Sequence, residues 1–240
     1  MAITRVEVTP KQGPGMRDVR GDVVRRQLTS DHSIVVPEVR SIVGFLIKSN
    51  IDADSISARV EDLFADPIIE DAATNSLMLS SEQHFPTPPD ATITVGFKAG
   101  VTDNPGSAAL DGFRTIFPEA GDDSISTYIT YAFFGLPEEI DVEWLAGTLH
   151  NNLIERALTA NREACAAGQW PAIEYTEKPP QVFEAPAHVD MEISDEALME
   201  LSETGLLALN LEEMQTIQAH YRDCLLYTSD AADDTPCVDL

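Results

Sequence analysis

Residues 92–113 read T-I-T-V-G-F-K-A-G-V-T-D-N-P-G-S-A-A-L-D-G-F, and a related pattern stands at residues 5–24, R-V-E-V-T-P-K-Q-G-P-G-M-R-D-V-R-G-D-V-V. Each stretch has an alternating strand pattern, then a Lys-x-Gly turn and the glycine-containing start of an amphipathic helix. In both copies a second strand and a second helix are expected to follow. The second helix of each copy is expected to end on a similar phrase, Asp66–Ala72 or Asn151–Ala157. A half-domain that occurs twice predicts that the two copies pair with each other.

The hydrophobic periodicity predicts the elements of each copy. In the first copy we expect a half-buried strand around Val6 and Val8, a helix over 18–28, and a strand over 39–47 that is apolar on both faces. A second helix should start at Asp54 or Ser55, with an inner face of Ile56, Val60, Leu63 and Phe64. A short strand is expected near 76–79. Those of the second copy are a strand over 93–97, a helix over 109–117, a strand over 127–133 and a helix with an inner face of Val142, Leu145, Leu149 and Leu153.

The predicted fold class is α+β, with two β-α-β-α(-β) repeats that form a pseudo-dimer, followed by short helices. The expected boundaries are 1–80 for the first repeat, 81–91 for a Pro-rich linker, 92–170 for the second repeat, 171–190 for an extended connector with a possible strand at 173–175, 191–223 for the start of a helical domain, and 224–240 for a tail. Ser194 and the capping-box pattern at Asn210–Glu213 predict the two helix starts in the helical part.

Residues 224–240 have a separate origin in our interpretation. Cys224–Ser229 is what TGTCTCTTATACACATCT encodes, Asp230–Asp233 is what GACGCTGCCGAC encodes, and Cys237–Leu240 is what TGTGTAGATCTC encodes. In this order the strings resemble a transposase-based sequencing-library adapter around a short index. We therefore interpret 224–240 as translated adapter and expect the natural reading frame to continue past Asp223. The alternative is a natural, acidic and disordered tail.

The chain carries a formal net charge of −26 at pH 7. Such a surface repels phosphate backbones and anionic lipids, so we expect neither a nucleic-acid nor a membrane partner. The longest apolar run, Ile42–Ile47, is far shorter than a bilayer span, and residues 1–10 lack a signal-peptide pattern. Two of the three cysteines lie in the tail, which leaves Cys165 without a disulfide partner. A reducing, cytoplasmic compartment is therefore expected.

Few residues suggest chemistry. The sequence has no phosphate-binding glycine loop, and its five histidines, at 32, 84, 150, 188 and 220, lack metal-ligand spacing. The acid pairs Glu138-Glu139 and Glu212-Glu213 stand at expected helix starts, where carboxylates complement the helix dipole. We expect Cys165, in the helical stretch 161–168, to be a buried thiol rather than a nucleophile.

Three groups of residues leave alternatives open. Asp103–Gly106 and its counterpart Asp18–Gly21 could bind an anion through backbone amides at a helix N-terminus, or could simply be a turn and cap. A basic cluster on the first helix could contact a phosphate or a partner, or could be a solvated face. Its members are Arg17, Arg20, Arg25 and Arg26. No catalytic, cofactor-binding or metal-binding residue is assigned.

Three stretches resemble the phosphoribosylformylglycinamidine synthase family. Val95–Leu110 is similar to the hallmark of its small subunit, K-x-x-V-x-D-P-x-G-x-A-x-x-x-A-L, with matches at Lys98, Val101, Asp103, Gly106 and Ala108. Pro105 comes one place late, after an inserted Asn104. Leu63–Glu70 resembles the end of the family's second helix. Ser194–Asp223 is similar to the start of the linker domain in the large single-chain enzyme, and this match is the most specific.

The resemblance implies an N-terminal, small-subunit-like scaffold and a truncated linker domain. The family enzyme is a carbon–nitrogen ligase of purine biosynthesis that uses ATP, Mg²⁺ and glutamine to convert formylglycinamide ribonucleotide to its amidine. Its synthetase and glutaminase domains, the expected partners, would follow Asp223, so this part would carry no catalytic residue and no cofactor. The first copy departs from the family pattern at Gly13–Arg17, which weakens any ligand contact there. The alternative is a non-enzymatic ferredoxin-like regulatory module that senses a ligand at the Lys-x-Gly turns or merely dimerises.

Overall fold

The computed structural model describes residues 1–119, 121–175 and 192–224, with side chains described as far as Tyr221. The chain divides into two compact units, Met1–Pro180 and Gln181–Leu240. The first unit contains both predicted repeats and the second contains the two predicted short helices. The predictions for the connector after Tyr175 and for the tail after Cys224 concern residues outside the described ranges.

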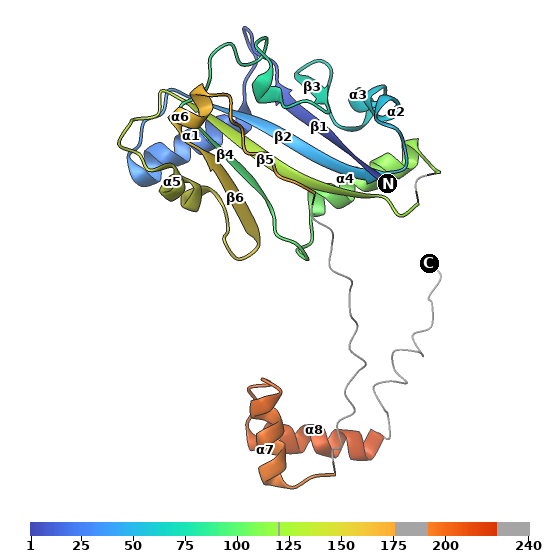
Figure 1. Ribbon diagram of the computed structural model, residues 1–240. Helices are drawn as coiled ribbons and strands as arrows, with labels where there is room; N and C mark the ends of the chain where they lie inside the picture. Colours follow the sequence, from blue (N-terminus) through green and yellow to red (C-terminus); the bar gives the residue numbers. More distant parts are fainter. Residues whose placement is uncertain (120, 176–191, 225–240) are drawn as a thin grey trace. The chain divides into compact units, whose positions relative to one another are not determined.

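The first unit is built on one antiparallel sheet of six strands, ordered β3-β1-β2-β5-β4-β6 (Figure 1). The strands are β1 Ala2–Pro10, β2 Glu38–Ser49, β3 Glu70–Thr74, β4 Ala91–Phe97, β5 Ser124–Phe134 and β6 Glu155–Ala160. The first repeat supplies β3-β1-β2 and the second supplies β5-β4-β6, so the order of one repeat mirrors that of the other. The long pairing of β2 with β5, from Glu38↔Phe134 to Lys48↔Ser124, joins them. The predicted α+β fold with two paired repeats is confirmed.

Short polar side chains cap five of the six helices described in this unit. The helices are α1 Val19–His32, α2 Ala53–Ser57, α3 Val60–Leu63, α4 Asn104–Ile116, α5 Val142–Leu149 and α6 Arg162–Ala166, with a 3₁₀ turn, η1, at Met78–Ser80. Aspartate carboxylates cap α1, α2, α4 and α5, the Asn161 amide caps α6, and α3 has no side-chain cap. Each cap accepts a hydrogen bond from a backbone N–H that has no partner inside the helix.

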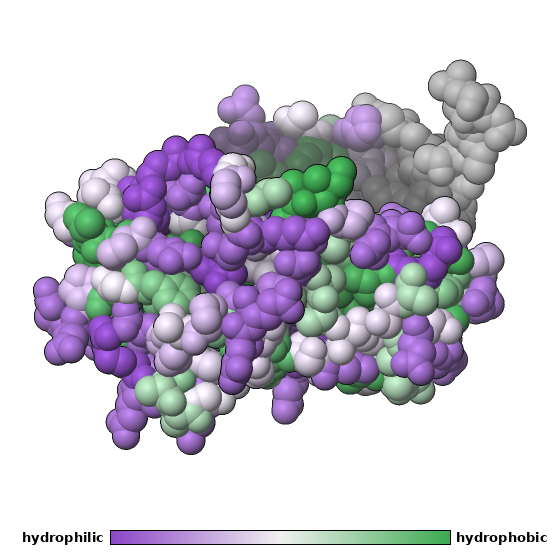
Figure 2. Space-filling view, turned by 90° about the horizontal axis from the view of Figure 1, so that it is seen from above, coloured by the Kyte–Doolittle hydropathy of each residue, from purple (hydrophilic) through white to green (hydrophobic). Residues whose placement is uncertain are grey.

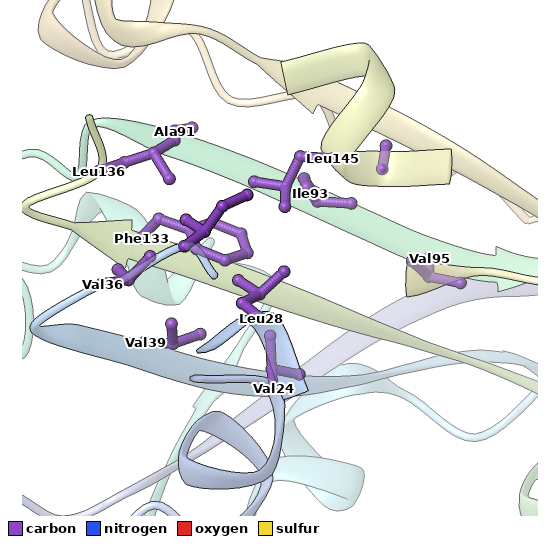
Figure 3. Close-up of a cluster of buried hydrophobic side chains, with 12 residues drawn as sticks. Val24, Leu28, Val36, Val39, Ala91, Ile93, Val95, Phe133, Leu136 and Leu145 are labelled. Atoms are coloured by element: carbon purple, nitrogen blue, oxygen red, sulfur yellow. The ribbon is translucent and has the colours of Figure 1, made fainter. Parts of the chain in front are cut away.

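The two repeats exchange their first helices. Val24 and Leu28 of α1 pack with Ile93 of β4, Phe133 of β5 and Leu145 of α5, so a first-repeat helix completes a second-repeat core (Figure 3). The reverse holds for α4, whose Phe113 and Phe117 pack against strands β1 and β2 and helices α2 and α3. Because odd-numbered residues of β5 pair with odd-numbered residues of β2, both cores lie on one face of the sheet.

Two chain segments cover part of the opposite face. Residues from 78 to 85 pack on Ile42 and Ala132, and Ile173 packs on Leu46 and Tyr128. The central strands β2 and β5 are thus covered on both faces, which agrees with the prediction that 39–47 is apolar on both sides. Hydrophilic residues occupy most of the surface seen in Figure 2, with hydrophobic residues in separate patches, as the acidic composition leads one to expect.

Some predicted elements were wrong. The phrases 66–72 and 151–157 do not end helices; each forms a turn that leads into an edge strand, β3 or β6. Residues 76–79 are not a strand, and Met78–Ser80 is a 3₁₀ turn. Leu153 lies in the second turn with 80 % of its surface exposed, because α5 ends at Leu149. Residues 173–175 form no strand.

The second unit contains α7, Asp195–Thr204, and α8, Leu211–Cys224. Ser194 caps α7, as predicted. The predicted capping box is present at α8, because the Asn210 N–H donates to Glu213 and the Glu213 N–H donates to the Asn210 side chain. Leu198 and Met214 are fully buried, so the two helices share a small core. No helix in the described parts of the chain is both long enough and apolar enough to cross a membrane.

Candidate functional site

At the two helix starts for which anion binding or a cap was left open, the protein's own carboxylates occupy the backbone amides. Asp103 accepts hydrogen bonds from the Gly106 N–H at 2.7 Å, the Thr127 N–H at 2.6 Å and the Thr127 hydroxyl at 2.9 Å. Asp18 repeats this arrangement with Gly21 at 2.7 Å and with the N–H and hydroxyl of Ser41 at 2.5 and 2.8 Å. A negative charge at each helix start repels a second anion, so these motifs tie helix to strand.

The glycines of these motifs have a steric reason. A Cβ on Gly21 would lie 1.9 Å from the Val39 carbonyl oxygen, and one on Gly106 would lie 2.5 Å from that of Ile125. The first turn of each helix therefore lies directly against the backbone of the following strand, which only glycine permits. In the repeated D-x-x-G pattern, the Asp therefore bonds the helix to the next strand and the Gly lets the helix approach that strand.

The Lys-x-Gly turns are equivalent as well. The Lys11 ammonium donates to the Pro67 carbonyl, and the Lys98 ammonium donates to the Asn152 carbonyl. The cavity beside the second turn, lined in part by Lys98, Gly100 and Arg156, has a volume of about 50 Å³. Ligand pockets usually occupy about 300–1,000 Å³, so this cavity is too small for an amino acid or a nucleotide.

A buried polar network on the second face of the sheet was not predicted. The Tyr128 hydroxyl donates to Glu7 Oε1 at 2.5 Å and accepts from Arg5 Nη1 at 2.5 Å, and the Met78 N–H donates to Glu7 Oε2 at 2.5 Å. Only 3 % of the Glu7 surface is exposed. The predicted half-buried strand, with Val6 and Val8 on its inner face, would leave the alternating Arg5 and Glu7 on the solvent side. In the structure the segment around Met78 covers that side, so both faces of the strand are covered here.

An open groove of about 410 Å³ adjoins this network, lined by Ile3, Arg5, Leu46, Asn75, Glu174 and Tyr175 among others. We call it the Arg5 groove. The Arg5 guanidinium also donates to the Ile173 carbonyl at 2.9 Å. The groove thus combines a cation, a carboxylate and an amide with an apolar floor. Such a lining suits a small zwitterionic or polar molecule, and among the described residues we take this groove as the best candidate ligand site.

Burial raises the pKa of Glu7, while hydrogen bonds from Tyr128 and Met78 and the charge of Arg5 lower it by less. The folded protein therefore binds a proton at Glu7 more readily than the unfolded chain does. As pH falls from the raised pKa of Glu7 toward the ordinary glutamate pKa of 4.5, this group favours the folded state increasingly. We expect the stability advantage of wild type over Glu7→Gln to grow as pH falls through this window. Urea unfolding at several pH values measures the trend, and parallel pH curves for the two proteins would contradict it.

The segment between β3 and β4 is held by a second set of polar contacts. The Arg40 guanidinium lies 4.0 Å from the Phe85 ring centroid and donates to the His84 carbonyl. The His84 ring contacts Ser81 Oγ at 2.8 Å and Asp71 at 3.1 Å. Ser81 and His84 belong to one turn, so we interpret these contacts as a tie between the segment and β3.

The histidines and the acid pairs noted in the sequence contact neighbouring residues or lie at turns and helix starts. His32 lies edge-on to Trp144, His150 contacts the Ala146 carbonyl, His220 lies beside Tyr221, and His188 is outside the described residues. Glu212 and Glu213 are in the first turn of α8, as predicted, whereas Glu138 and Glu139 precede α5 in a turn. The described residues contain no group of three or more His, Cys, Asp or Glu that could hold a metal ion.

The basic cluster surrounds one aspartate. Arg17 and Arg25 form ion pairs with the Asp22 carboxylate at 2.6 and 3.4 Å, and Arg26 donates to the Asp22 carbonyl. The hydrogen bond from Arg17 is the main cause of the lowered pKa of Asp22. Arg20 forms no hydrogen bond or ion pair with any described residue. It is the member of the cluster that is available to a partner.

Cys165 is a buried thiol in α6, as predicted. Burial raises the pKa of this thiol to about 11 from the ordinary cysteine value of 9.0. Because the thiolate is the reacting form, at pH 8 this shift alone should slow alkylation about 100-fold. In a variant with Cys224 and Cys237 replaced by Ser, we expect iodoacetamide to label Cys165 at least ~100-fold more slowly in the native protein than in urea. Equal rates in both states would show that the thiol is not protected.

Comparison with known proteins assigns no relative. No protein-family model matches this sequence, and no curated protein matches it.

Proposed function

We propose that this chain is the N-terminal scaffold of a phosphoribosylformylglycinamidine synthase. The observation that carries the proposal is the run Val95–Leu110, in which Lys98, Asp103 and Gly106 match the hallmark of the family's small subunit. In this chain those residues form the corner between β4 and α4: Lys98 closes the turn, Asp103 caps the helix, and Gly106 lets the helix approach β5. The same corner occurs in both repeats, which is what a covalent pair of small subunits requires.

In the proposed enzyme this scaffold performs no chemistry itself. Its role is to hold the synthetase and glutaminase domains in position for glutamine- and ATP-dependent amidine formation in the cytoplasm. ATP, Mg²⁺ and the catalytic residues belong to those domains. The strongly acidic surface supports a protein partner over a nucleic acid or an anionic membrane.

Resequencing the source DNA through codon 223 tests the proposal directly. We expect the open reading frame to continue into a linker domain, an ATP-binding synthetase and a glutaminase. The extended protein should convert formylglycinamide ribonucleotide to the amidine with glutamine and ATP. A stop codon shortly after codon 223, or a genuine genomic sequence for 224–240, would overturn the assignment.

A second candidate function, a ligand-sensing module, is favoured by the Arg5 groove. Its volume of about 410 Å³ lies within the usual range of ligand pockets, unlike the cavity at the second Lys-x-Gly turn. Isothermal titration with amino acids and nucleotides tests this function. Saturable heat that Arg5→Ala abolishes would support a sensor, and no heat at millimolar ligand would eliminate it.

A further inference from the structure

A second open groove lies on the helix-covered face of the sheet, between α1, β5 and the end of α5. We call it the α1–α5 groove. It has a volume of about 410 Å³ and is lined mainly by apolar side chains. The lining residues include Val19, Val23, Ile129, Tyr131, Thr148 and Leu149. Val19 and Val23 are 65 % and 48 % exposed, which is high for valines that face a groove.

The first repeat shows what fills the equivalent space. Asp18 and Asp103 are 85 residues apart, and so are Glu70 and Glu155. With the same offset, Leu63 and Phe64 of the first repeat are equivalent to Thr148 and Leu149 of the second. Ser41 and Thr127 are 86 residues apart, and this offset makes Phe45 equivalent to Tyr131. These are the positions that carry matching hydrogen bonds in the two repeats.

In the first repeat this space is closed. The Phe64 ring packs on the Phe45 ring with centroids 4.7 Å apart, and both pack against the buried core with Leu63. The Leu63 Cδ2 methyl lies 3.9 Å from the position that a Cβ on Gly112 of α4 would occupy. In the second repeat Leu149 also packs against the buried core, but the smaller Thr148 and Leu149 replace leucine and phenylalanine, and an open groove remains beside them.

One charged side chain, Arg20, lines the α1–α5 groove, and Asp18 and Glu155 lie near enough to act on Tyr131. The charge of Arg20 also acts on Tyr131, and the Arg20 side chain forms no hydrogen bond or ion pair with a described residue. Arg25 and Arg26 stand on the same helix. In a chain with a net charge of −26, an arginine that lines an apolar groove and forms no ion pair with a described residue favours an occupant that carries carboxylates.

We propose that the α1–α5 groove is a docking site for a protein segment that presents two adjacent large apolar side chains flanked by carboxylates. The first repeat contains such a segment, Glu61-Asp62-Leu63-Phe64-Ala65-Asp66, which fills the equivalent space. The inference rests on the comparison of the two repeats and on the charge of Arg20. It holds whether or not the chain belongs to the proposed synthase.

The probe for this site is a fluorescent peptide with the sequence of residues 57–67, S-A-R-V-E-D-L-F-A-D-P, titrated with the full chain in an anisotropy assay. We expect saturable binding. A peptide in which both Leu63 and Phe64 are replaced by Ser should bind at least ~30-fold more weakly, because two buried apolar side chains are lost. Arg20→Ala should weaken binding of the parent peptide by about 3–10-fold.

Two variants of the groove test the location. The double variant Thr148→Leu/Leu149→Phe copies the first repeat, so it should fill the groove and abolish binding while it raises the melting temperature. Val23→Glu, at an exposed position that the fold does not need, should weaken binding at least ~10-fold through lost apolar contact and like-charge repulsion. Val35→Glu, at a valine that is 68 % exposed and does not line the groove, is the matched control.

The outcomes are separable. Binding that Val23→Glu and the double variant both abolish, and Val35→Glu spares, supports the site. Equal binding by wild type and Val23→Glu, or no preference for the parent peptide over its Ser-substituted form, overturns it. Concentration-dependent dimerisation in light scattering, lost in Val23→Glu, would identify a second copy of the chain as the occupant and overturn the proposed segment.

Discussion

Asp103→Ala is expected to lower the free energy of unfolding by about 3–5 kcal/mol. The change removes a helix cap, which costs about 1 kcal/mol. It also leaves the buried N–H and hydroxyl of Thr127 without their acceptor, at about 1–3 kcal/mol for each group. Because Asp103 is only 5 % exposed, water has little access to replace the carboxylate. Urea unfolding, with the midpoint and slope fitted together, measures the loss.

Asp52→Ala is the matched control for this prediction. Asp52 also caps a helix, accepting from the N–H and hydroxyl of Ser55, but it is exposed and contacts no strand through these bonds. We expect a much smaller loss for Asp52→Ala than for Asp103→Ala. Similar losses for the two variants would mean that the tie between α4 and β5 contributes nothing beyond an ordinary cap. Asp18→Ala should resemble Asp103→Ala, since its three hydrogen bonds are equivalent.

Gly44→Ala is expected to destabilise the fold by a similar amount, about 3–5 kcal/mol. The Tyr128 ring crosses over Gly44 to reach Glu7, and a Cβ on Gly44 would lie 2.0 Å from the ring carbon Cζ. Overpacking of this kind costs about 1–3 kcal/mol. A displaced ring would also leave the buried Glu7 carboxyl without its hydroxyl donor, which adds about 1–3 kcal/mol.

A double-mutant cycle isolates this clash. In a Tyr128→Ala background the ring is absent, so Gly44→Ala should cost less than ~1 kcal/mol, which gives a coupling of at least ~2 kcal/mol between the two sites. Gly147→Ala is the control for a change of glycine to alanine. No atom lies within 4 Å of the new methyl group, and in helix α5 the change should stabilise by about 0.5–1 kcal/mol. Additive losses at Gly44 and Tyr128 would refute the steric account.

The sequence was sufficient to predict the paired repeats, because both copies carry the same long signals. Alternation in β2 and β5, and the D-x-x-G start of α1 and α4, each combine a hydrophobic period with a fixed cap. The edge strands β3 and β6 escaped prediction because they are short and half-buried, and β3 has no alternating pattern of burial. A five-residue strand gains its identity from pairing with β1, which is a long-range contact.

The site residues were harder to foresee for the same reason. Arg5 and Glu7 alternate with valines as solvent-facing residues do, and only the return of the chain at Met78 buries them. Gly44 was the available signal, since a glycine inside an apolar central strand marks a close approach by another group. The Asp18 and Asp103 motifs were recognised as helix starts, but not as ties to the next strand, because Ser41 and Thr127 lie more than 20 residues away.

The exchange of α1 between the repeats also governs how the chain can emerge from a ribosome. When the first repeat has been synthesised, Val24 and Leu28 have no second-repeat strands to pack on, since Ile93, Phe133 and Leu145 come later in the chain. The first repeat therefore has to wait as an incomplete half with an exposed apolar helix until translation has passed β6. A ribosome pause before β4, β5, α5 and β6 have all emerged prolongs the exposure, because Ala157 of β6 also packs against this core.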